Sequence, residues 1–333
     1  MDKPAPEFTK LIDLASERLG GQTLLCSDDF FAPMENLLKQ GRGVFIEDKY
    51  TDHGKWMDGW ESRRKRTSGH DWCILKLGAS GVIKGFDIDT NHFLGNHPPH
   101  AAVDAICTDE DLKNEELQNC DWKEILPRVD LDPGSQHFFD IDNENKWTHL
   151  KLNIYPDGGV ARFKVYGNVY KNWDLVSGDD TVDLAAAENG GRSVLCNDMF
   201  FSHMGNLIMP GRSDNMGDGW ETKRNRDPEN VDWVMIKLAH PGTIKKIIVD
   251  TNHFKGNYPD TFSLELCYKE NGDTPEYMDD GWEEVLTRVK LEAHEEHEFI
   301  TEIKEHQKVN YAKLKIYPDG GVSRLRLFGN IVK

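Results

Sequence analysis

A segment that combines Asp, Glu and Arg occurs twice in this chain and could carry out acid–base chemistry. It reads Asp-Gly-Trp-Glu-Ser-Arg-Arg at 58–64 and Asp-Gly-Trp-Glu-Thr-Lys-Arg at 218–224. A Glu can donate or accept a proton, and an Arg guanidinium can bind a carboxylate through two parallel hydrogen bonds. A turn with a packed Trp and an ion pair could also serve the scaffold alone. Both interpretations stay open at this point.

A second repeated segment adds Asn and His. Asp-Thr-Asn-His-Phe occupies 89–93 and 250–254, and each copy continues through Gly to a further Asn. The Asn side chains could bond the amide groups of a ligand, and the His could move a proton. Alternatively, Asp and Thr cap a turn while His bonds a backbone carbonyl. Because a turn would accept Ser or Asp as well, the presence of Asn and His in both copies favours a functional role.

A third repeated segment places an Arg just after a turn. Tyr-Pro-Asp-Gly-Gly at 155–159 is followed by Arg162, and the same five residues at 317–321 are followed by Arg324. We expect both Arg on the outward face of the next strand, where they could be solvated or could clamp a carboxylate.

The candidate site residues come from these three segments. The candidate catalytic residues are Glu61, His92, Glu221 and His253. The candidate substrate-binding residues are Asp58, Trp60, Arg64, Asn91, Asn96, Arg162, Asp218, Trp220, Arg224, Asn252, Asn257 and Arg324. His97 and His100 lie close to His92, but the second copy has only one His there, so neither a metal nor another cofactor is predicted.

The paired segments belong to an internal duplication that sets the domain organisation. Matching residues are offset by 170 up to Arg42 and by 160 to 162 from Asp58 onward. The first copy therefore carries about ten extra residues within 43–57, which we expect to form a surface loop. The predicted parts are a first repeat at 1–170, a linker at 171–181 and a second repeat at 182–333.

The elements that must position the candidate residues are short β-strands. Leu150, Leu152 and Ile154 alternate with polar residues before the Pro-Asp-Gly-Gly turn, and Phe163 and Val165 alternate after it. This pattern predicts a hairpin with one buried face, in which Pro and Gly form the turn. Short strands with Gly and Pro turns and few helices predict an all-β chain of two tandem jelly-roll β-sandwiches.

Composition narrows the partners and the compartment. The net charge of -18 argues against a nucleic acid or an anionic membrane as partner, although local Arg could still bind a small anion. No apolar run is long enough to span a membrane, and no signal peptide is recognisable, so we expect a cytoplasmic protein. The six Cys have no metal-like spacing. We expect buried free thiols, and a nucleophilic Cys26 or Cys196 is less favoured because no His lies near either in sequence.

Four motifs, each present twice and in the same order, resemble the allantoicase family. They are Gly-Gly, Asp-Gly-Trp-Glu-x-x-Arg, Asp-Thr-Asn-His-Phe-x-Gly-Asn and Tyr-Pro-Asp-Gly-Gly-x-x-Arg, and the resemblance extends from Leu11 to Gly329. It implies a galactose-binding-like jelly roll in each half and hydrolysis of allantoate to ureidoglycolate and urea in purine breakdown. It also implies a homo-oligomer.

The candidate residues suit this chemistry. Allantoate carries a carboxylate and two ureido groups on one carbon, so its site needs an Arg, amide-binding Asn or Asp, and an acid–base pair. The rival interpretation is a non-catalytic tandem carbohydrate-binding module. Such modules expose aromatic platforms, whereas the repeated aromatics here lie beside charged residues, which favours a small polar anion. Two active copies, one active copy, or one site lined by both copies all remain open.

Overall fold

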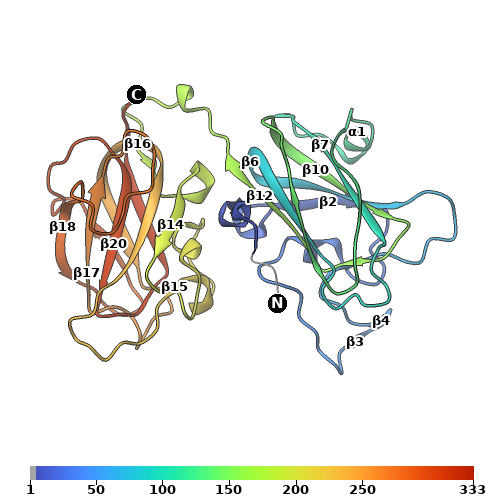
Figure 1. Cartoon of the computed structure of the whole chain (residues 1–333), viewed down its shortest axis with the longest axis horizontal. Helices are drawn as coiled ribbons and strands as arrows, with labels where there is room; N and C mark the ends of the chain where they lie inside the picture. Colours follow the sequence, from blue (N-terminus) through green and yellow to red (C-terminus); the bar gives the residue numbers. More distant parts are fainter. Residues whose placement is uncertain (1–4) are drawn as a thin grey trace. The chain divides into compact units, whose positions relative to one another are not determined.

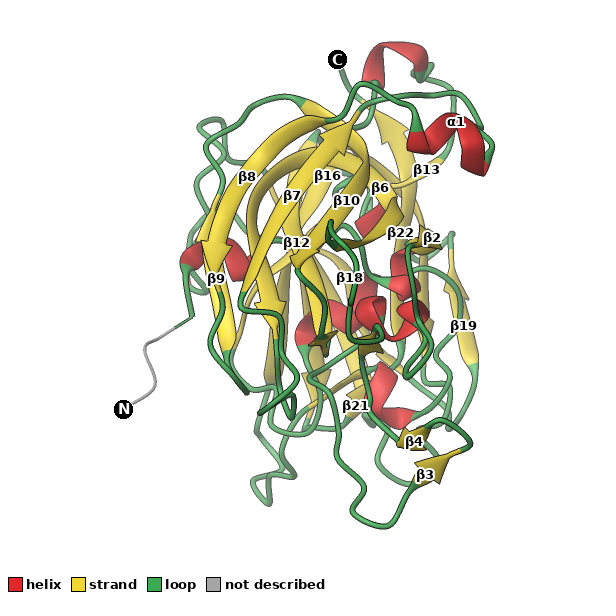
Figure 2. Ribbon diagram, turned by 90° about the vertical axis from the view of Figure 1, so that its right-hand side faces the viewer, coloured by secondary structure: helices red, strands yellow, loops and turns green. Residues whose placement is uncertain are grey.

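Two 19-residue strands, β6 (Asp71–Asp89) and β16 (Asp232–Asp250), organise the fold (Figure 1). The computed structural model describes residues 5–333. The chain divides into two compact units, one up to Tyr170 and one from Lys171 to Lys333, and each contains one long strand. Strands dominate both units, and the helices are short turns (Figure 2). None of the described helices is long and apolar enough to cross a membrane.

Within residues 5–170, the first unit contains twelve strands, one α-helix and three 3₁₀ turns. Its other strands are β1 (Ile12–Asp13), β2 (Gln22–Cys26), β3 (Tyr50–Thr51), β4 (Gly54–Lys55), β5 (Trp60–Glu61), β7 (His100–Ile106), β8 (Lys123–Asp130), β9 (Gln136–Asp140), β10 (Lys146–Tyr155), β11 (Gly159–Val160) and β12 (Arg162–Val169). Its helical segments are η1 (Glu7–Lys10), η2 (Glu17–Leu19), η3 (Met34–Leu38) and α1 (Asn114–Gln118).

The second unit follows the same order of elements, with two exceptions. Its other strands are β13 (Val182–Asp183), β14 (Arg192–Cys196), β15 (Trp220–Glu221), β17 (Thr261–Cys267), β18 (Glu283–Lys290), β19 (Glu296–Phe299), β20 (Val309–Tyr317), β21 (Gly321–Val322) and β22 (Arg324–Ile331). Its 3₁₀ turns are η4 (Trp173–Leu175), η5 (Ala187–Asn189), η6 (Met204–Ile208) and η7 (Met216–Asp218). The exceptions are that η7 takes the place of β3 and β4 and that no α-helix lies between β17 and β18.

Each long strand is shared by two layers of antiparallel strands. Residues 71–76 of β6 pair with β2 and β10, and residues 85–89 pair with β9 and β12. The strand order is therefore β2-β6-β10-β7-β8 in one layer and β1-β12-β6-β9 in the other. β16 pairs in the same way with β14 and β20 and then with β19 and β22. The predicted all-β chain of two tandem jelly-roll β-sandwiches is confirmed.

The cores lie between these layers, on the strand faces that the alternation predicts. Leu150, Leu152 and Ile154 of β10 and Phe163 and Val165 of β12 are all fully buried. The corresponding apolar residues of β20 and β22 are buried as well. Burial of such side chains is the main favourable contribution to folding, so the hairpin around the Pro-Asp-Gly-Gly turn is anchored in each core.

The extra segment of the first unit, 43–57, forms the surface loop that the sequence predicts. β3 and β4 pair within it as a small hairpin, and most of its residues are exposed. The His53 ring stacks on Phe30 with 4.0 Å between ring centroids, and its Nδ1 donates to the Phe30 carbonyl at 2.7 Å. The second unit has no such segment, and its corresponding Phe200 is 64% exposed.

Candidate active site

Within each unit, the three repeated segments meet near the end of the long strand, β6 in the first unit and β16 in the second. In the first unit β5 pairs with β11, which places Glu61 opposite Gly159. The Gly159 N–H donates to the Asn96 carbonyl at 2.8 Å, and the Ala161 N–H donates to the Asp89 carbonyl at 2.7 Å. The second unit repeats this arrangement through β15 and β21. The structure therefore brings each unit's three segments into one loop cluster.

Two successive Gly residues make this close approach feasible. Gly158 has φ 138°, and a Cβ on Gly159 would lie only 2.0 Å from the Phe93 ring. The first position needs a backbone region that glycine favours, and the second needs the missing side chain. In the second unit, a Cβ on Gly321 would lie equally close to the Phe254 ring. The Gly-Gly pair and the Phe of the neighbouring segment therefore form one packing unit.

A Glu–Asn pair occupies the same place in both clusters. Asn96 Nδ2 donates to Glu61 Oε1 at 2.6 Å, and Asn257 Nδ2 donates to Glu221 Oε1 at 2.5 Å. Burial raises the pKa of the Glu61 carboxyl, although the bond from Asn96 opposes this in part. A carboxyl group with a raised pKa, oriented by a neutral donor, is suited to act as a general acid.

An exposed Arg follows each Glu by three residues. Arg64 and Arg224 are both exposed, and neither forms a hydrogen bond or ion pair with any residue between 5 and 333. An Arg without a protein partner keeps all its donors for an anionic ligand. These two side chains are therefore the available carboxylate clamps among the candidate residues.

The expectation that Arg162 and Arg324 face outward into solvent is wrong. Both side chains are only 3% exposed. Arg162 Nη2 donates to Asp58 Oδ2 at 2.6 Å and its Nη1 donates to the Asp58 carbonyl at 2.9 Å, and Arg324 binds Asp218 in the same way. The loop that carries the Asp folds over this strand face, where ion pairing compensates for the loss of hydration. Four candidate binding residues thus bind one another.

This ion pair also determines the charge state of its Asp. Burial by itself would raise the pKa of Asp58, but the hydrogen bonds from Arg162 and from the Val44 N–H hold it below its usual value. Asp58 is therefore an anion that fixes the loop, and no proton on it is available for catalysis.

The two Trp of the repeated segments are core residues. Trp60 and Trp220 are fully buried. Their Nε1 atoms donate to the carbonyls of Asp28 and Asp198 at 2.9 and 2.8 Å. This arrangement does not support the prediction that Trp60 and Trp220 contact the substrate directly, because a ligand could not reach their rings without moving the loop.

One pair of functional candidates escaped the sequence reasoning. Arg42 binds Asp89 through Nε and Nη2 at 2.8 and 2.9 Å, and Arg212 binds Asp250 at 2.9 and 3.0 Å. Both Asp are almost completely buried, whereas about half of each Arg side chain is exposed. The sequence signal for this pair is the Gly-Arg match at 41–42 and 211–212 within the duplication.

Asn91 and Asn252 fix the loops that follow these Arg. Asn91 Nδ2 donates to the Gly43 carbonyl at 2.8 Å, and Asn252 Nδ2 donates to the Ser213 carbonyl at 3.0 Å. Their amide groups are thus partly used by the scaffold, in contrast to Asn96 and Asn257, whose donors bind a carboxylate.

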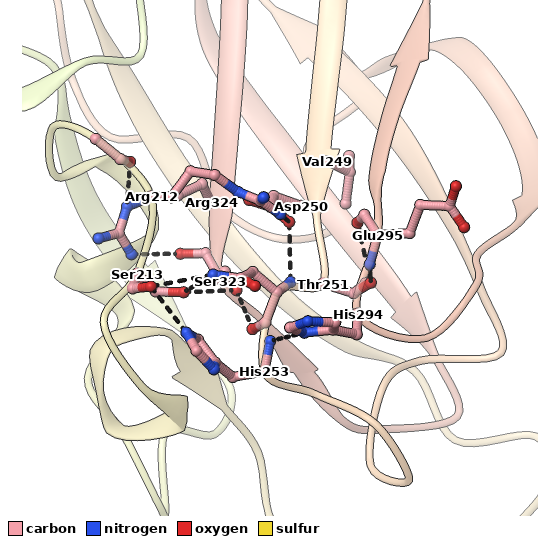
Figure 3. Close-up of polar contacts among 12 residues, drawn as sticks. Arg212, Ser213, Val249, Asp250, Thr251, His253, His294, Glu295, Ser323 and Arg324 are labelled. Atoms are coloured by element: carbon pink, nitrogen blue, oxygen red, sulfur yellow. Dashed lines mark hydrogen bonds and ion pairs between the residues drawn. The ribbon is translucent and has the colours of Figure 1, made fainter.

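The two candidate His differ in their surroundings. Both adopt a left-handed backbone, with φ 67° at His92 and 70° at His253. His253 Nε2 contacts the Ser213 carbonyl at 2.9 Å, and the His253 N–H donates to His294 Nδ1 at 2.7 Å (Figure 3). The His92 ring lies 5.5 Å from the Phe45 ring and forms no hydrogen bond within the described part of the chain.

The two candidate Cys residues, Cys26 and Cys196, are not activated. Burial, followed by the nearby Asp carboxylates, raises the pKa of Cys26 to about 12 and that of Cys196 to about 11. All six thiols are free, but Cys107 is exposed, so the expectation of uniformly buried thiols is wrong there. A thiol with a raised pKa is a poor nucleophile. Over residues 5–333, no three His, Cys, Asp or Glu side chains are grouped to hold a metal ion.

Comparisons with known proteins agree over nearly the whole chain. The sequence pattern of the allantoicase repeat matches residues 12–170 and 182–332. A probable allantoicase of Pseudomonas aeruginosa (strain UCBPP-PA14) is 49% identical over 331 residues, covering 98% of both chains. A probable allantoicase 1 of Burkholderia mallei (strain ATCC 23344) is 48% identical over 335 residues, covering 100% of this chain and 98% of that protein. The crystal structure of an allantoicase from Saccharomyces cerevisiae superposes with a TM-score of 0.82 at 37% identity, covering 96% of this chain and 93% of that one.

Proposed function

The chain belongs to the allantoicase family, and from that premise we propose that it hydrolyses allantoate to ureidoglycolate and urea. The substrate is a small anion with two ureido groups, which suits a loop cluster lined by Arg, Asn and Glu. The reaction adds one water and breaks one bond between the central carbon and a ureido nitrogen.

The observation that carries this proposal is the Glu–Asn pair. A half-buried carboxyl, oriented by an amide, lies three residues before an unpaired Arg in both units. We assign Glu61 or Glu221 as the general acid that protonates the departing urea nitrogen. Arg64 or Arg224 binds the substrate carboxylate, which orients the central carbon toward the acid.

The second half of the reaction needs a base. When the C–N bond breaks, the lone pair of the remaining ureido nitrogen forms a C=N bond with the central carbon. Water then adds to this carbon, its oxygen becomes the hydroxyl of ureidoglycolate, and its proton goes to His92 or His253. The His releases this proton to solvent and the Glu takes one up from solvent before the next turnover, so that atoms and charges balance.

The remaining candidates act one step away from the substrate. We propose that Asp58 with Arg162, and Asp218 with Arg324, hold the loops that carry the acid. Asn91 and Asn252 position the loops that carry His, and Trp60 and Trp220 anchor the Glu segment in the core. A carbohydrate-binding platform built on these Trp is disfavoured, because both rings are fully buried.

The direct test is release of urea from allantoate by the purified chain and by Glu61→Gln and Glu221→Gln variants. Gln retains an oxygen that can accept from the Asn but cannot donate a proton. Loss of a general acid should lower kcat by about 10²–10⁴-fold in each copy that is active. The assignment of Glu as acid is refuted if the double variant keeps wild-type kcat and KM.

We also propose a cytoplasmic location and a homo-oligomer. The six free thiols suit a reducing compartment, where disulfides are rare. The oligomer rests on the family resemblance alone, and light scattering coupled to size-exclusion chromatography measures it directly.

A further inference from the structure

Strained backbone is concentrated on three His residues. Within residues 5–333, the non-glycine residues with positive φ are His92, His253 and His294, the last with φ 58°. Side chains disfavour this left-handed region, and residues held there cluster at active sites. His294 was not singled out from the sequence, yet it shares this conformation with both candidate bases.

The two units also differ near the site at position 294. The hydroxyl groups of Thr90 and Thr251 each lie within hydrogen-bond distance of the carbonyls at both ends of a four-residue loop. The third residue of that loop is Gly134 in the first unit, with φ 63°, and His294 in the second. The backbone conformation is therefore the same in both units. The first unit has a glycine there, which adopts it without strain, whereas the second has a His, which is strained and carries an imidazole.

That imidazole bonds the backbone of the candidate base. The backbone N–H of His253 can only donate, so His294 Nδ1 accepts this bond with its lone pair. His253 Nε2 faces the Ser213 carbonyl, which can only accept, so Nε2 carries the proton. The lone pair of neutral His253 is therefore on Nδ1. Figure 3 shows both His rings beyond the strand ends, with only one ring nitrogen of His253 in a drawn contact.

The carbonyl that orients the His253 ring is itself held in place. Ser213 Oγ donates to Ser323 Oγ at 3.1 Å, and Ser323 Oγ donates to the Asn252 carbonyl at 2.5 Å. The residues at these two serine positions in the first unit are Gly43 and Ala161, which have no hydroxyl. Both the base and its orienting groups are thus more constrained in the second unit.

We propose that His294 is a positioning residue that holds His253 with its Nδ1 lone pair free, and that the second repeat therefore performs the proton transfer. This inference rests on the proposed hydrolysis of allantoate. The first repeat lacks the device, because Gly134 offers no acceptor to the His92 N–H. A reaction becomes slower when the orientation of its catalytic groups is left unconstrained.

The test compares two replacements of His294 in the full chain, by urea release from allantoate. His294→Gly copies the first repeat, removes the strain and removes the acceptor. His294→Asn also tolerates the left-handed backbone, and its Oδ1 can accept from the His253 N–H. We expect His294→Gly to lower kcat by about 10–10²-fold with little change in KM, and His294→Asn to restore most of it.

A double variant separates positioning from general stability. If His294 acts only through His253, then His253→Ala with His294→Gly should be no slower than His253→Ala alone. His306→Ala is the matched control, because its ring also accepts a backbone N–H, from Ile244 at 3.2 Å, well before the end of β16. This control should keep wild-type kcat.

Four results would each overturn the inference. The first two are wild-type kcat in His294→Gly and wild-type kcat in His253→Ala. The others are equal losses in the Gly and Asn variants of His294 and multiplied losses in the double variant. A wild-type chain that releases no urea would instead refute the proposed function itself, so the two failures are distinguishable.

Discussion

Asp87 should make the first sandwich less stable as the pH rises from acid to neutral. It lies in β6, is 3% exposed, and accepts one hydrogen bond, from Gln136 Nε2 at 2.8 Å to Oδ2. Its Oδ1 has no partner among the residues that the structure describes. Burial raises the pKa of this carboxyl from 3.8 to about 7, and nearby Asp89 adds to the effect.

The sign and the size follow from proton linkage. The folded chain keeps the proton on Asp87 up to about pH 7, whereas the unfolded chain releases it above about pH 4, so the stabilising contribution is present at low pH and is lost as pH rises. Each tenfold difference in proton affinity corresponds to about 1.4 kcal/mol, which gives a total of about 4 kcal/mol across this window.

The assay is the free energy of unfolding in guanidinium chloride for wild type and Asp87→Asn between pH 4.5 and 8. Asn has the same shape, can accept the bond from Gln136, and does not ionise. The stability of the wild type relative to the variant should fall by about 3–4 kcal/mol over this range. Asp87→Ile, which introduces the residue found at the matching position 248, should remove the same pH dependence.

A difference that stays constant with pH would mean that Asp87 ionises normally, which would refute the reasoning. If the stability of the wild type relative to Asp87→Asn instead rose with pH, the positive charges of Lys164 and Arg42, which favour the anion, would outweigh burial.

Three further predictions concern packing and reactivity. Arg324→Met should lower the free energy of unfolding by about 3–5 kcal/mol, because Asp218 then stays buried without its partner; adding Asp218→Leu should recover much of this loss in the same denaturation assay. Gly321→Ala should cost about 1–3 kcal/mol, because the new Cβ would lie 2.0 Å from the Phe254 ring, and Phe254→Leu should relieve it. Cys26, with its raised pKa, should react with an aromatic disulfide at pH 8 at least about 100-fold more slowly than a free thiol; a rate like that of free cysteine would contradict this.

Local patterns were sufficient to predict the β-hairpins. The apolar residues of β10 and β12 alternate with period two, and Pro and Gly mark the turn, so both the strands and their buried face can be inferred from neighbouring residues. The surface loop at 43–57 could be inferred because the second repeat provides an internal comparison that lacks it.

The orientation of Arg162 and Arg324 could not be inferred in this way. Alternation predicts which strand face is apolar, but it does not say whether a loop covers the other face. The partners of these Arg lie about one hundred residues earlier in the chain, so the pair exists only once the sandwich has formed. His294 escaped detection for a similar reason, since only the fold brings its ring to the His253 N–H.

The ion pairs that close each loop cluster, Asp58 with Arg162 and Asp218 with Arg324, lie wholly within their own sandwich. A substitution that abolishes catalysis in one repeat can therefore leave the packing of that repeat, and of its sibling, unaffected. Natural selection would then retain a catalytically inactive repeat for its fold, while the residues of its site change. Gly134 and His294, at matching loop positions of the two repeats, are the kind of difference that such a gene duplication permits.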